Sequence, residues 1–448
     1  MTNKIFLSVF FFFLINLSYF SDAQPFNPPE WSYDKAIYEV NIRQYTPEGN
    51  FKSFEKHLPQ LNELGADILW LMPIHPIGEK NRKGALGSYY SVKDYKAVNP
   101  EFGTIEDFKE LVQIAHKMGM YVIIDWVANH SAWDNSWIVD NPEYYTTDSL
   151  GHIIPPNPDW TDVADLNYDN KELWIDMIDA LKFWVEECDI DGYRCDVAGM
   201  VPIEFWIEAR IELEKIKPVF MLAEWDTPEV HLAFDMTYDW NTHKIMNGIV
   251  KKEKRVSDLI NQIQKNENDF PKNAFRMEFT SNHDENSWNG TEYERLGDGA
   301  ETFAVLTCII PDMPLVYTGQ EAGNEKRLSF FDKDTVGWKD HELFHIYSKL
   351  FDLKKNNQAL FNGNHGGKII FLECPDNSNI FAFTRSANDD KVLAIFNLSN
   401  QEQKFEITGE TLQGSYLDYF TNNSQSFGNR KSMSLNAWEY RIYIKYQY

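Results

Sequence analysis

The sequence predicts an α/β protein built on a (β/α)8 TIM barrel, with a short insertion after the third strand and a C-terminal antiparallel β domain. Two observations carry this prediction. Up to residue 365, short apolar runs alternate with helical patterns, and such alternation favours parallel strands joined by right-handed crossovers. From residue 366 the chain changes to short β-like runs separated by Asn, Asp, Ser and Gly, which is typical of antiparallel strands.

Apolar runs between helical segments mark the expected barrel strands. One of the intervening helices opens at Thr104, with Asp107 three residues on as in a capping box, and ends at Gly119. Such a series over roughly 340 residues suits a barrel with insertions. An open doubly wound sheet is the alternative, but it would require a Gly-rich phosphate loop after the first strand, and the sequence has none there. The expected strands are residues 36–40, 67–71, 121–127, 191–196, 219–223, 233–238, 275–279 and 314–317.

The N-terminal residues 1–23 have the pattern of a signal peptide. Lys4 precedes an apolar run from Ile5 to Phe20, and small residues then offer a cleavage site before Gln24. The run is short for a spanning helix, although an uncleaved anchor is the alternative. We therefore expect a secreted or periplasmic protein with no membrane span after signal cleavage.

The remaining chain is expected to form two domains. Residues 24–365 would form the barrel, including an insertion at residues 131–165 that is too long for an ordinary loop. Residues 366–448 would form a small β-sandwich. Its expected strands are residues 368–373, 380–385, 391–397, 403–407 and 440–446.

Charge and composition exclude some partners. The net charge of −26 disfavours nucleic acid and anionic lipid surfaces, and it is compatible with a neutral substrate. Aromatic residues make up 15% of the chain, which suits either a rich core or ring faces that stack on sugars. The four cysteines show no metal-binding spacing. Three of them fall in predicted strands or helices, so we expect buried free thiols, with one disulfide left open.

Charged residues end several of the predicted strands. Arg194 and Asp196 end the fourth, Glu224 ends the fifth, and His283 and Asp284 follow the seventh. In a barrel such residues gather at one rim, and burying them is costly unless they converge on a function. Glycoside hydrolysis offers one, because it needs one carboxylic acid to protonate the leaving oxygen and a second carboxylate at the anomeric carbon.

Four ordered motifs carry a resemblance to a known family. They are Asp125–His130, Gly192–Asp196, Glu224 at a strand end, and Asn282–Asp284, with a weaker fifth at residues 164–167. The chain resembles the α-amylase superfamily of retaining glycosidases over nearly its whole length after the signal segment. The resemblance implies a glycoside hydrolase acting on α-glucans.

Roles for individual residues also come from this resemblance. It implies Asp196 as the nucleophile, Glu224 as the general acid/base and Asp284 as a third carboxylate that grips sugar hydroxyls. Asp125 would be a structural partner of the Arg194 region. The implied substrate-binding residues are Tyr90, His130, Arg194 and His283.

One departure from the family pattern follows the expected nucleophile. Many members carry a His four residues after it, whereas this chain has Gly199 and Met200. This weakens the transfer of the family's calcium site, for which Asn129 is the remaining side-chain candidate. No cofactor is expected for the chemistry itself, and bound Ca²⁺ is left open.

Three functions compete at this stage. The favoured one is hydrolysis of α-1,4 bonds in starch or maltooligosaccharides through a covalent glycosyl-enzyme intermediate. The second keeps the fold but acts as an oligo-1,6-glucosidase, a cyclomaltodextrinase or a glucanotransferase. The third is a non-catalytic glycan-binding protein, against which the intact set of three carboxylates argues.

Overall fold

The computed structural model describes residues 26–375 and 378–445 of the chain, so the expected signal segment lies outside the described residues. Eight parallel strands close into a barrel in the order β1-β10-β9-β8-β7-β6-β3-β2, which confirms the predicted fold class. All eight predicted strand segments are present. Their bounds are β1 Ile37–Val40, β2 Ile68–Leu71, β3 Tyr121–Trp126, β6 Gly192–Cys195, β7 Phe220–Ala223, β8 Met236–Tyr238, β9 Phe275–Phe279 and β10 Met313–Tyr317.

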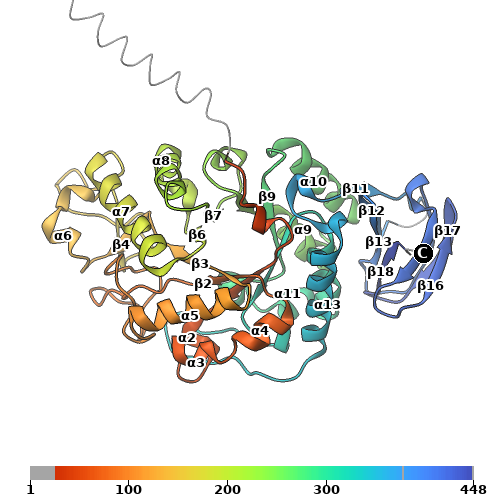
Figure 1. The fold of residues 1–448 in the computed structure, drawn as a ribbon, viewed down its shortest axis with the longest axis horizontal. Coiled ribbons are helices and arrows are strands. Elements are labelled where there is room, and N and C mark those ends of the chain that lie inside the picture. Colours follow the sequence, from red (N-terminus) through yellow and green to blue (C-terminus); the bar gives the residue numbers. More distant parts are fainter. Residues whose placement is uncertain (1–25, 376–377, 446–448) are drawn as a thin grey trace, which may run out of the picture.

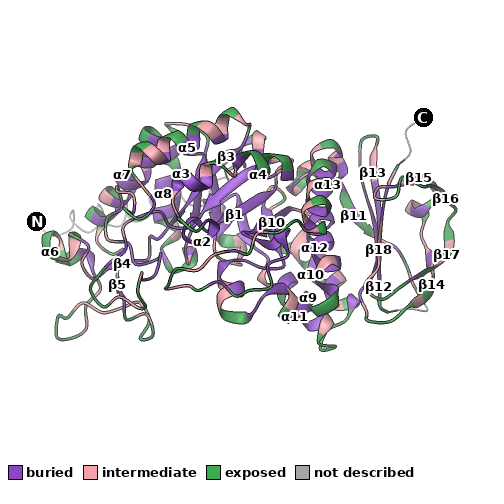
Figure 2. Ribbon diagram, turned by 90° about the horizontal axis from the view of Figure 1, so that it is seen from below, coloured by how far each residue is buried: buried purple, intermediate pink, exposed green. Residues whose placement is uncertain are grey.

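Side chains alternate across the barrel wall because successive strand residues point to opposite faces. Inward residues such as Trp70, Leu222 and Met277 fill the barrel interior, and most outward ones pack under the surrounding helices. Figure 2 shows the strands as a buried centre and the helices exposed on their outer sides. The larger helices are α4 Leu58–Leu64, α5 Ile105–Lys117, α7 Lys171–Cys188, α8 Ile203–Glu214, α9 Trp240–Val250, α10 Val256–Asp269, α12 Ala300–Ile309 and α13 Glu342–Asn356; the shorter ones are α2 Ile42–Tyr45, α3 Phe51–Glu55, α6 Trp137–Asp140 and α11 Glu292–Leu296.

Helix α5 illustrates how local sequence sets these elements. The Thr104 hydroxyl accepts a hydrogen bond from Asp107 N at 3.1 Å, and the Asp107 carboxylate accepts one from Thr104 N at 2.9 Å. The predicted capping box is therefore formed. Gly119 follows the helix with φ +81°, a left-handed conformation that glycine adopts without steric cost.

The insertion after β3 contains a small antiparallel pair. Strands β4, His130–Ala132, and β5, Val163–Asp165, pair with His130 opposite Asp165. Figure 2 shows this pair at the end of the molecule away from the C-terminal domain. The insertion begins directly after β3, so it lies at the rim where the barrel strands end.

The C-terminal domain is a β domain that flanks the barrel on one side (Figure 1). A six-stranded sheet in the order β11-β12-β13-β18-β15-β16 faces the two-stranded β14-β17 sheet across an apolar cluster. Five of these strands match predicted segments, whereas β15, β16 and β17 were not predicted. The bounds are β11 Lys368–Phe371, β12 Ile380–Ala387, β13 Asp390–Asn397, β14 Gln403–Thr408, β15 Gly414–Asp418, β16 Ser424–Phe427, β17 Arg430–Leu435 and β18 Tyr440–Lys445.

The structure also bears on the cysteines and on membrane-spanning helices. Cys188, Cys195 and Cys308 are buried free thiols, as predicted. Among residues 26–375 and 378–445, no helix combines the length and the apolar character needed to cross a membrane.

Candidate active site

The predicted site residues gather in one cavity at the carboxyl ends of the barrel strands. Because parallel strands all end at the same rim, residues after β3, β6, β7 and β9 meet there. The cavity has a volume of about 420 Å³. Its lining includes six of the predicted residues, namely Tyr90, His130, Asp196, Glu224, His283 and Asp284.

Arg194 lies beneath the cavity and organises its carboxylates. The guanidinium is fully buried, and its Nη1 lies 2.9 Å from Asp125 Oδ1 and 3.0 Å from Asp196 Oδ1. Its Nη2 lies 3.0 Å from Glu224 Oε2, although no N–H of that nitrogen points at the oxygen. Its Nε donates to the Tyr238 hydroxyl at 3.1 Å. One cation therefore holds three carboxylates in place.

Burial and the shared cation set the ionisation of these carboxylates. Burial raises the pKa of Asp196 to about 6, against the attraction of Arg194, which lowers it. Burial raises the pKa of Glu224 further, to about 7, and the negative charges of Asp196 and Asp284 add to the rise. Glu224 therefore holds its proton to higher pH than Asp196, as an acid beside a nucleophile must. Burial also raises the pKa of the Asp125 carboxyl to about 6.

A second network fixes His283 at the cavity wall. Its Nδ1 lies 2.5 Å from Glu39 Oε1, and its Nε2 lies 2.8 Å from the Tyr90 hydroxyl. The Tyr90 hydroxyl also donates to Asp125 Oδ2 at 3.0 Å, which joins this network to the Arg194 cluster. Asp284 Oδ2 lies 3.4 Å from His283 Nε2 and remains partly exposed, so it can meet a ligand.

Glu39 is a site residue that sequence reasoning missed. It lies in the middle of β1 and is fully buried. The available signal was a lone carboxylate inside an otherwise apolar strand, which requires a partner when buried. That partner is His283, which lies 244 residues away along the chain.

His130 and Asn129 sit where the insertion begins. Burial lowers the pKa of His130 to about 4, so the ring is neutral at neutral pH. The Asn129 amide contacts His130 Nδ1 at 3.2 Å, and the Asn129 carbonyl accepts from Leu166 N at 3.1 Å.

Asn129 is the predicted candidate for a calcium ligand. Ca²⁺ prefers six to eight oxygen ligands, usually including carboxylates. Within the described part of the chain, no group of three His, Cys, Asp or Glu side chains is arranged to hold a metal ion. The contact with His130 is made by Asn129 Nδ2, whereas Ca²⁺ would bind the Oδ1 of that amide, so calcium binding at Asn129 stays a prediction.

Aromatic residues that the sequence did not single out form one wall of the cavity. Phe330 lies parallel to Tyr90 at 6.1 Å between ring centroids and packs on Trp288 at 5.1 Å. Phe331 continues this wall, and its carbonyl accepts from Leu86 N at 3.0 Å, which joins the loop after β10 to the loop after β2. These residues lie in loops without a hydrophobic periodicity, so the sequence alone does not show that they line the cavity.

The chain just after Asp196 is shaped by close packing. Val197 has φ +36°, an uncommon conformation for a β-branched residue, and its N–H donates to Glu224 Oε2 at 2.8 Å. A Cβ at Gly199 would lie 2.1 Å from the Trp225 ring, so only glycine fits there. Met200 is 44% exposed. The departure from the family pattern thus coincides with an indole packed directly on the backbone.

Comparisons with known proteins agree with this arrangement. A family model described as the α-amylase catalytic domain matches residues 20–160 and 157–337, and one for the C-terminal domain of the α-amylase SusG matches residues 380–442. Alpha-amylase 2 of Dictyoglomus thermophilum is 25% identical, covering 89% of this chain and 74% of that protein.

Two solved structures are similar over almost the whole fold. The maltogenic α-amylase AmyB of Thermotoga neapolitana is 29% identical with a TM-score of 0.86, covering 93% of this chain and 99% of that one. An α-amylase of Lactobacillus plantarum is 31% identical with a TM-score of 0.84, covering 93% and 100%. The chain therefore belongs to the α-amylase family and is a glycoside hydrolase.

Proposed function

We propose that this enzyme hydrolyses α-1,4-glucosidic bonds of starch or maltooligosaccharides with retention of configuration. The observation that carries the proposal is the contact of Asp196 and Glu224 with one guanidinium, inside a cavity that Asp284 also lines. In the retaining route one carboxylate attacks the anomeric carbon directly while the other supplies a proton, which suits Asp196 beside Glu224 with its higher pKa. The α-amylases among its relatives support an α-1,4-glucan as the substrate.

Asp196 attacks the anomeric carbon in the proposed first step, while Glu224 donates its proton to the leaving oxygen. The higher pKa of Glu224 keeps that proton available when Asp196 is ionised. In the second step Glu224 takes a proton from water, which then cleaves the glycosyl ester on Asp196. Both carboxylates thus return to their starting states.

The surrounding residues position the sugar in this proposal. The partly exposed Asp284 accepts hydrogen bonds from sugar hydroxyls, and His283 lies beside it, with Nε2 3.4 Å from the Asp284 carboxylate. The Tyr90 ring offers an apolar face for a pyranose, and His130 also lines the cavity, as a neutral imidazole that can donate or accept. Arg194 contacts no solvent, so it acts by keeping Asp196 oriented and ionised.

Product analysis tests this function. Maltoheptaose should release reducing ends, and ¹H NMR of the first products should show the α-anomer before mutarotation. First products in the β-anomer would contradict retention. Longer products formed without net release of reducing ends would instead identify a transglycosylase, and cleavage of pullulan but not of maltoheptaose would identify an α-1,6 preference.

We further propose that the protein is exported. The support is the signal pattern of residues 1–23, with Lys4 ahead of an apolar run. N-terminal sequencing of protein from the native host should begin at Gln24. A mature chain that keeps Met1 in a membrane fraction would identify an uncleaved anchor instead.

A further inference from the structure

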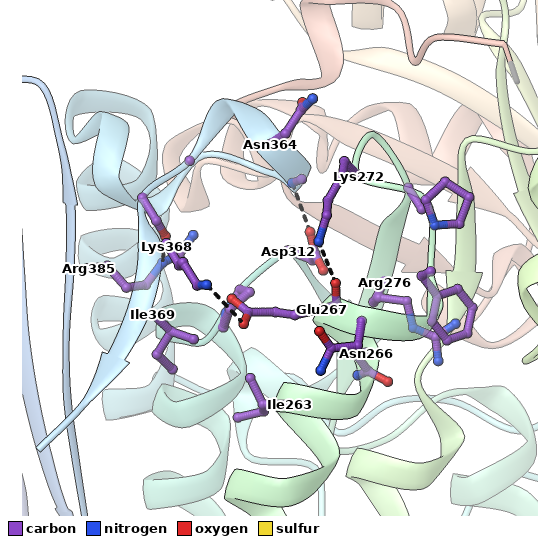
Figure 3. A pocket seen from close by; sticks show the side chains of 18 of the residues that line it. Ile263, Asn266, Glu267, Lys272, Arg276, Asp312, Asn364, Lys368, Ile369 and Arg385 are labelled. Carbon is purple, nitrogen blue, oxygen red and sulfur yellow. Dashed lines mark hydrogen bonds and ion pairs between the residues drawn. The ribbon is translucent and has the colours of Figure 1, made fainter. Parts of the chain in front are cut away.

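A second cavity, between the barrel and the C-terminal domain, does not adjoin the carboxylates of the active site (Figure 3). It lies where β9 and β10 begin, at the opposite end of these strands. Its charged groups contact one another or the backbone: Lys368 lies 3.9 Å from Glu267, and Lys272 Nζ donates to the Glu267 carbonyl at 2.7 Å. The residues that decide where along a glucan the enzyme cuts are therefore those at the other rim of the barrel.

The barrel topology sets the direction in which a bound chain runs. In the closed order of strands, β7 is four strands from β1 in either direction, so Glu224, which follows β7, lies across the barrel from β1. Glu224 is the proposed proton donor to the leaving oxygen, so the leaving part of the chain lies on the β7 side. C1 and C4 are at opposite ends of a glucopyranose ring. The non-reducing part of the chain, which continues from C4, therefore runs toward β1.

A segment between β2 and α5 crosses the rim on that side. This rim segment, residues 82–88, contacts the loop after β10, because Leu86 N donates to the Phe331 carbonyl at 3.0 Å. A Cβ at Gly84 would lie 2.4 Å from Phe331 Cβ, so the backbone of the rim segment packs directly on this side chain. The loop after β2 and the loop after β10 therefore meet above β1, which lies between the two strands in the barrel.

Arg43 fixes the rim segment from below. It lies in α2, just after β1, and only 2% of its surface is exposed. Its Nη1 donates to the Gly87 carbonyl at 3.0 Å and to the Phe330 carbonyl at 3.3 Å. One buried guanidinium thus joins the rim segment to the aromatic wall of the cavity, which keeps the two in contact.

Lys83 connects the other side of the rim segment to the insertion. Its Nζ lies 3.0 Å from Asp162 Oδ1 and donates to the Asp159 carbonyl at 2.8 Å. The Asp162 side chain is 7% exposed and that of Lys83 is 33% exposed, and both line the active-site cavity. The rim segment therefore forms a continuous wall from the insertion to the loop after β10, on the side of the cavity away from Glu224.

We propose that Lys83 determines where the enzyme cuts, because it holds the rim segment as a wall that stops a glucan at its non-reducing end. The enzyme then releases short saccharides from that end. Among the described residues that line the cavity, none comes from residues 239–274, between β8 and β9, which leaves the side next to Glu224 for the leaving part of the chain. This inference rests on the proposed hydrolysis at Asp196 and adds the end of the chain from which it proceeds.

Two matched substrates test the proposal. They are maltoheptaose and the same saccharide with an ethylidene acetal across O4 and O6 of its non-reducing glucosyl unit. Their kcat/KM values are measured by chromatography of the products, with the full chain and with Lys83→Ala. Lys80→Ala is the control, because Lys80 is exposed in the same loop and does not line the cavity. Lys83→Arg keeps the charge that faces Asp162.

The unmodified protein should cleave the blocked substrate at least about tenfold more slowly than the free one, because the acetal meets the wall. Lys83→Ala should raise the relative rate on the blocked substrate by at least about threefold, whereas Lys83→Arg and Lys80→Ala should leave it unchanged. Equal rates on both substrates in the unmodified protein overturn this proposal and leave the proposed hydrolysis standing. The same selectivity in Lys83→Ala as in Lys80→Ala also overturns it. Cleavage of neither substrate overturns this proposal and the proposed function together.

Discussion

Replacing Glu39 by Gln tests whether His283 acts as a cation in the cleft. Burial alone would lower the pKa of His283, but the carboxylates of Asp284 and Glu39 raise it to about 9. Glu39 makes the closer contact, 2.5 Å from Nδ1, against 3.4 Å between Asp284 and Nε2. Gln preserves the size and the hydrogen-bond acceptor and removes the charge.

The size of the expected effect follows from that shift. A rise from 6.5 to about 9 corresponds to roughly 3.4 kcal/mol at about 1.36 kcal/mol per pKa unit. This rise remains after burial has lowered the pKa, so the two carboxylates together supply more than it, and Glu39→Gln should lower the His283 pKa by at least about one unit. A hydrogen bond from a neutral imidazole is worth roughly 1 kcal/mol less than one from a protonated imidazole. Above pH 8, where only the variant loses the His283 proton, kcat/KM should therefore fall about fivefold to tenfold relative to the unchanged protein. Near pH 6 the ring stays protonated in both proteins, and the loss should be smaller.

Two measurements check this reasoning. Imidazole resonances followed by ¹H–¹⁵N NMR should show the lower pKa, and kcat/KM from pH 5 to 9 should show the alkaline loss. The raised pKa also stabilises the fold below pH 6.5 and loses this effect as pH rises through 9, so the melting deficit of the variant should shrink over that window. Glu30→Gln, at an exposed position, is the control. An unchanged His283 titration in Glu39→Gln would refute the argument.

Four other outcomes follow from the site. Asp196→Asn and Glu224→Gln should each lower kcat on the order of a thousandfold or more with little change in melting temperature, and near-normal rates would contradict their roles. The profile of kcat/KM should fall below pH 6 as Asp196 gains a proton and above pH 7 as Glu224 loses one; a flat profile from pH 5 to 8 would contradict this assignment. Phe331→Ala should change the product lengths from maltoheptaose, measured by chromatography, because it opens the aromatic wall. Dialysis against EDTA should leave the melting temperature unchanged, because no group of three His, Cys, Asp or Glu side chains in the described part of the chain is arranged to hold a metal ion; a fall restored by Ca²⁺ would show a metal site.

The barrel was predictable because its strands are buried on both faces. Such strands appear in the sequence as continuous apolar runs, and each begins a unit that ends in a helix. Strands β16 and β17 were missed for the opposite reason. In Ser424–Phe427 and Arg430–Leu435 most residues are polar and at least partly exposed, so no apolar run marks them.

The site was predictable only where residues follow strands. Asp196 and Glu224 do so, and their meeting is a consequence of parallel topology. Glu39 and Phe330 contribute through contacts that span hundreds of residues or arise in irregular loops. No sequence pattern marks Glu39 or Phe330 as a site residue, so their partners can be identified only in the folded structure.

At Gly199, just after the expected nucleophile, the chain departs from the family pattern, and the packing of the fold explains the glycine found there. Trp225 directly follows Glu224, and its indole occupies the space that a side chain at residue 199 would need. A bulky residue there would push the indole away and disturb the turn through Val197, whose N–H donates to Glu224. Glycine at 199 and tryptophan at 225 therefore belong together.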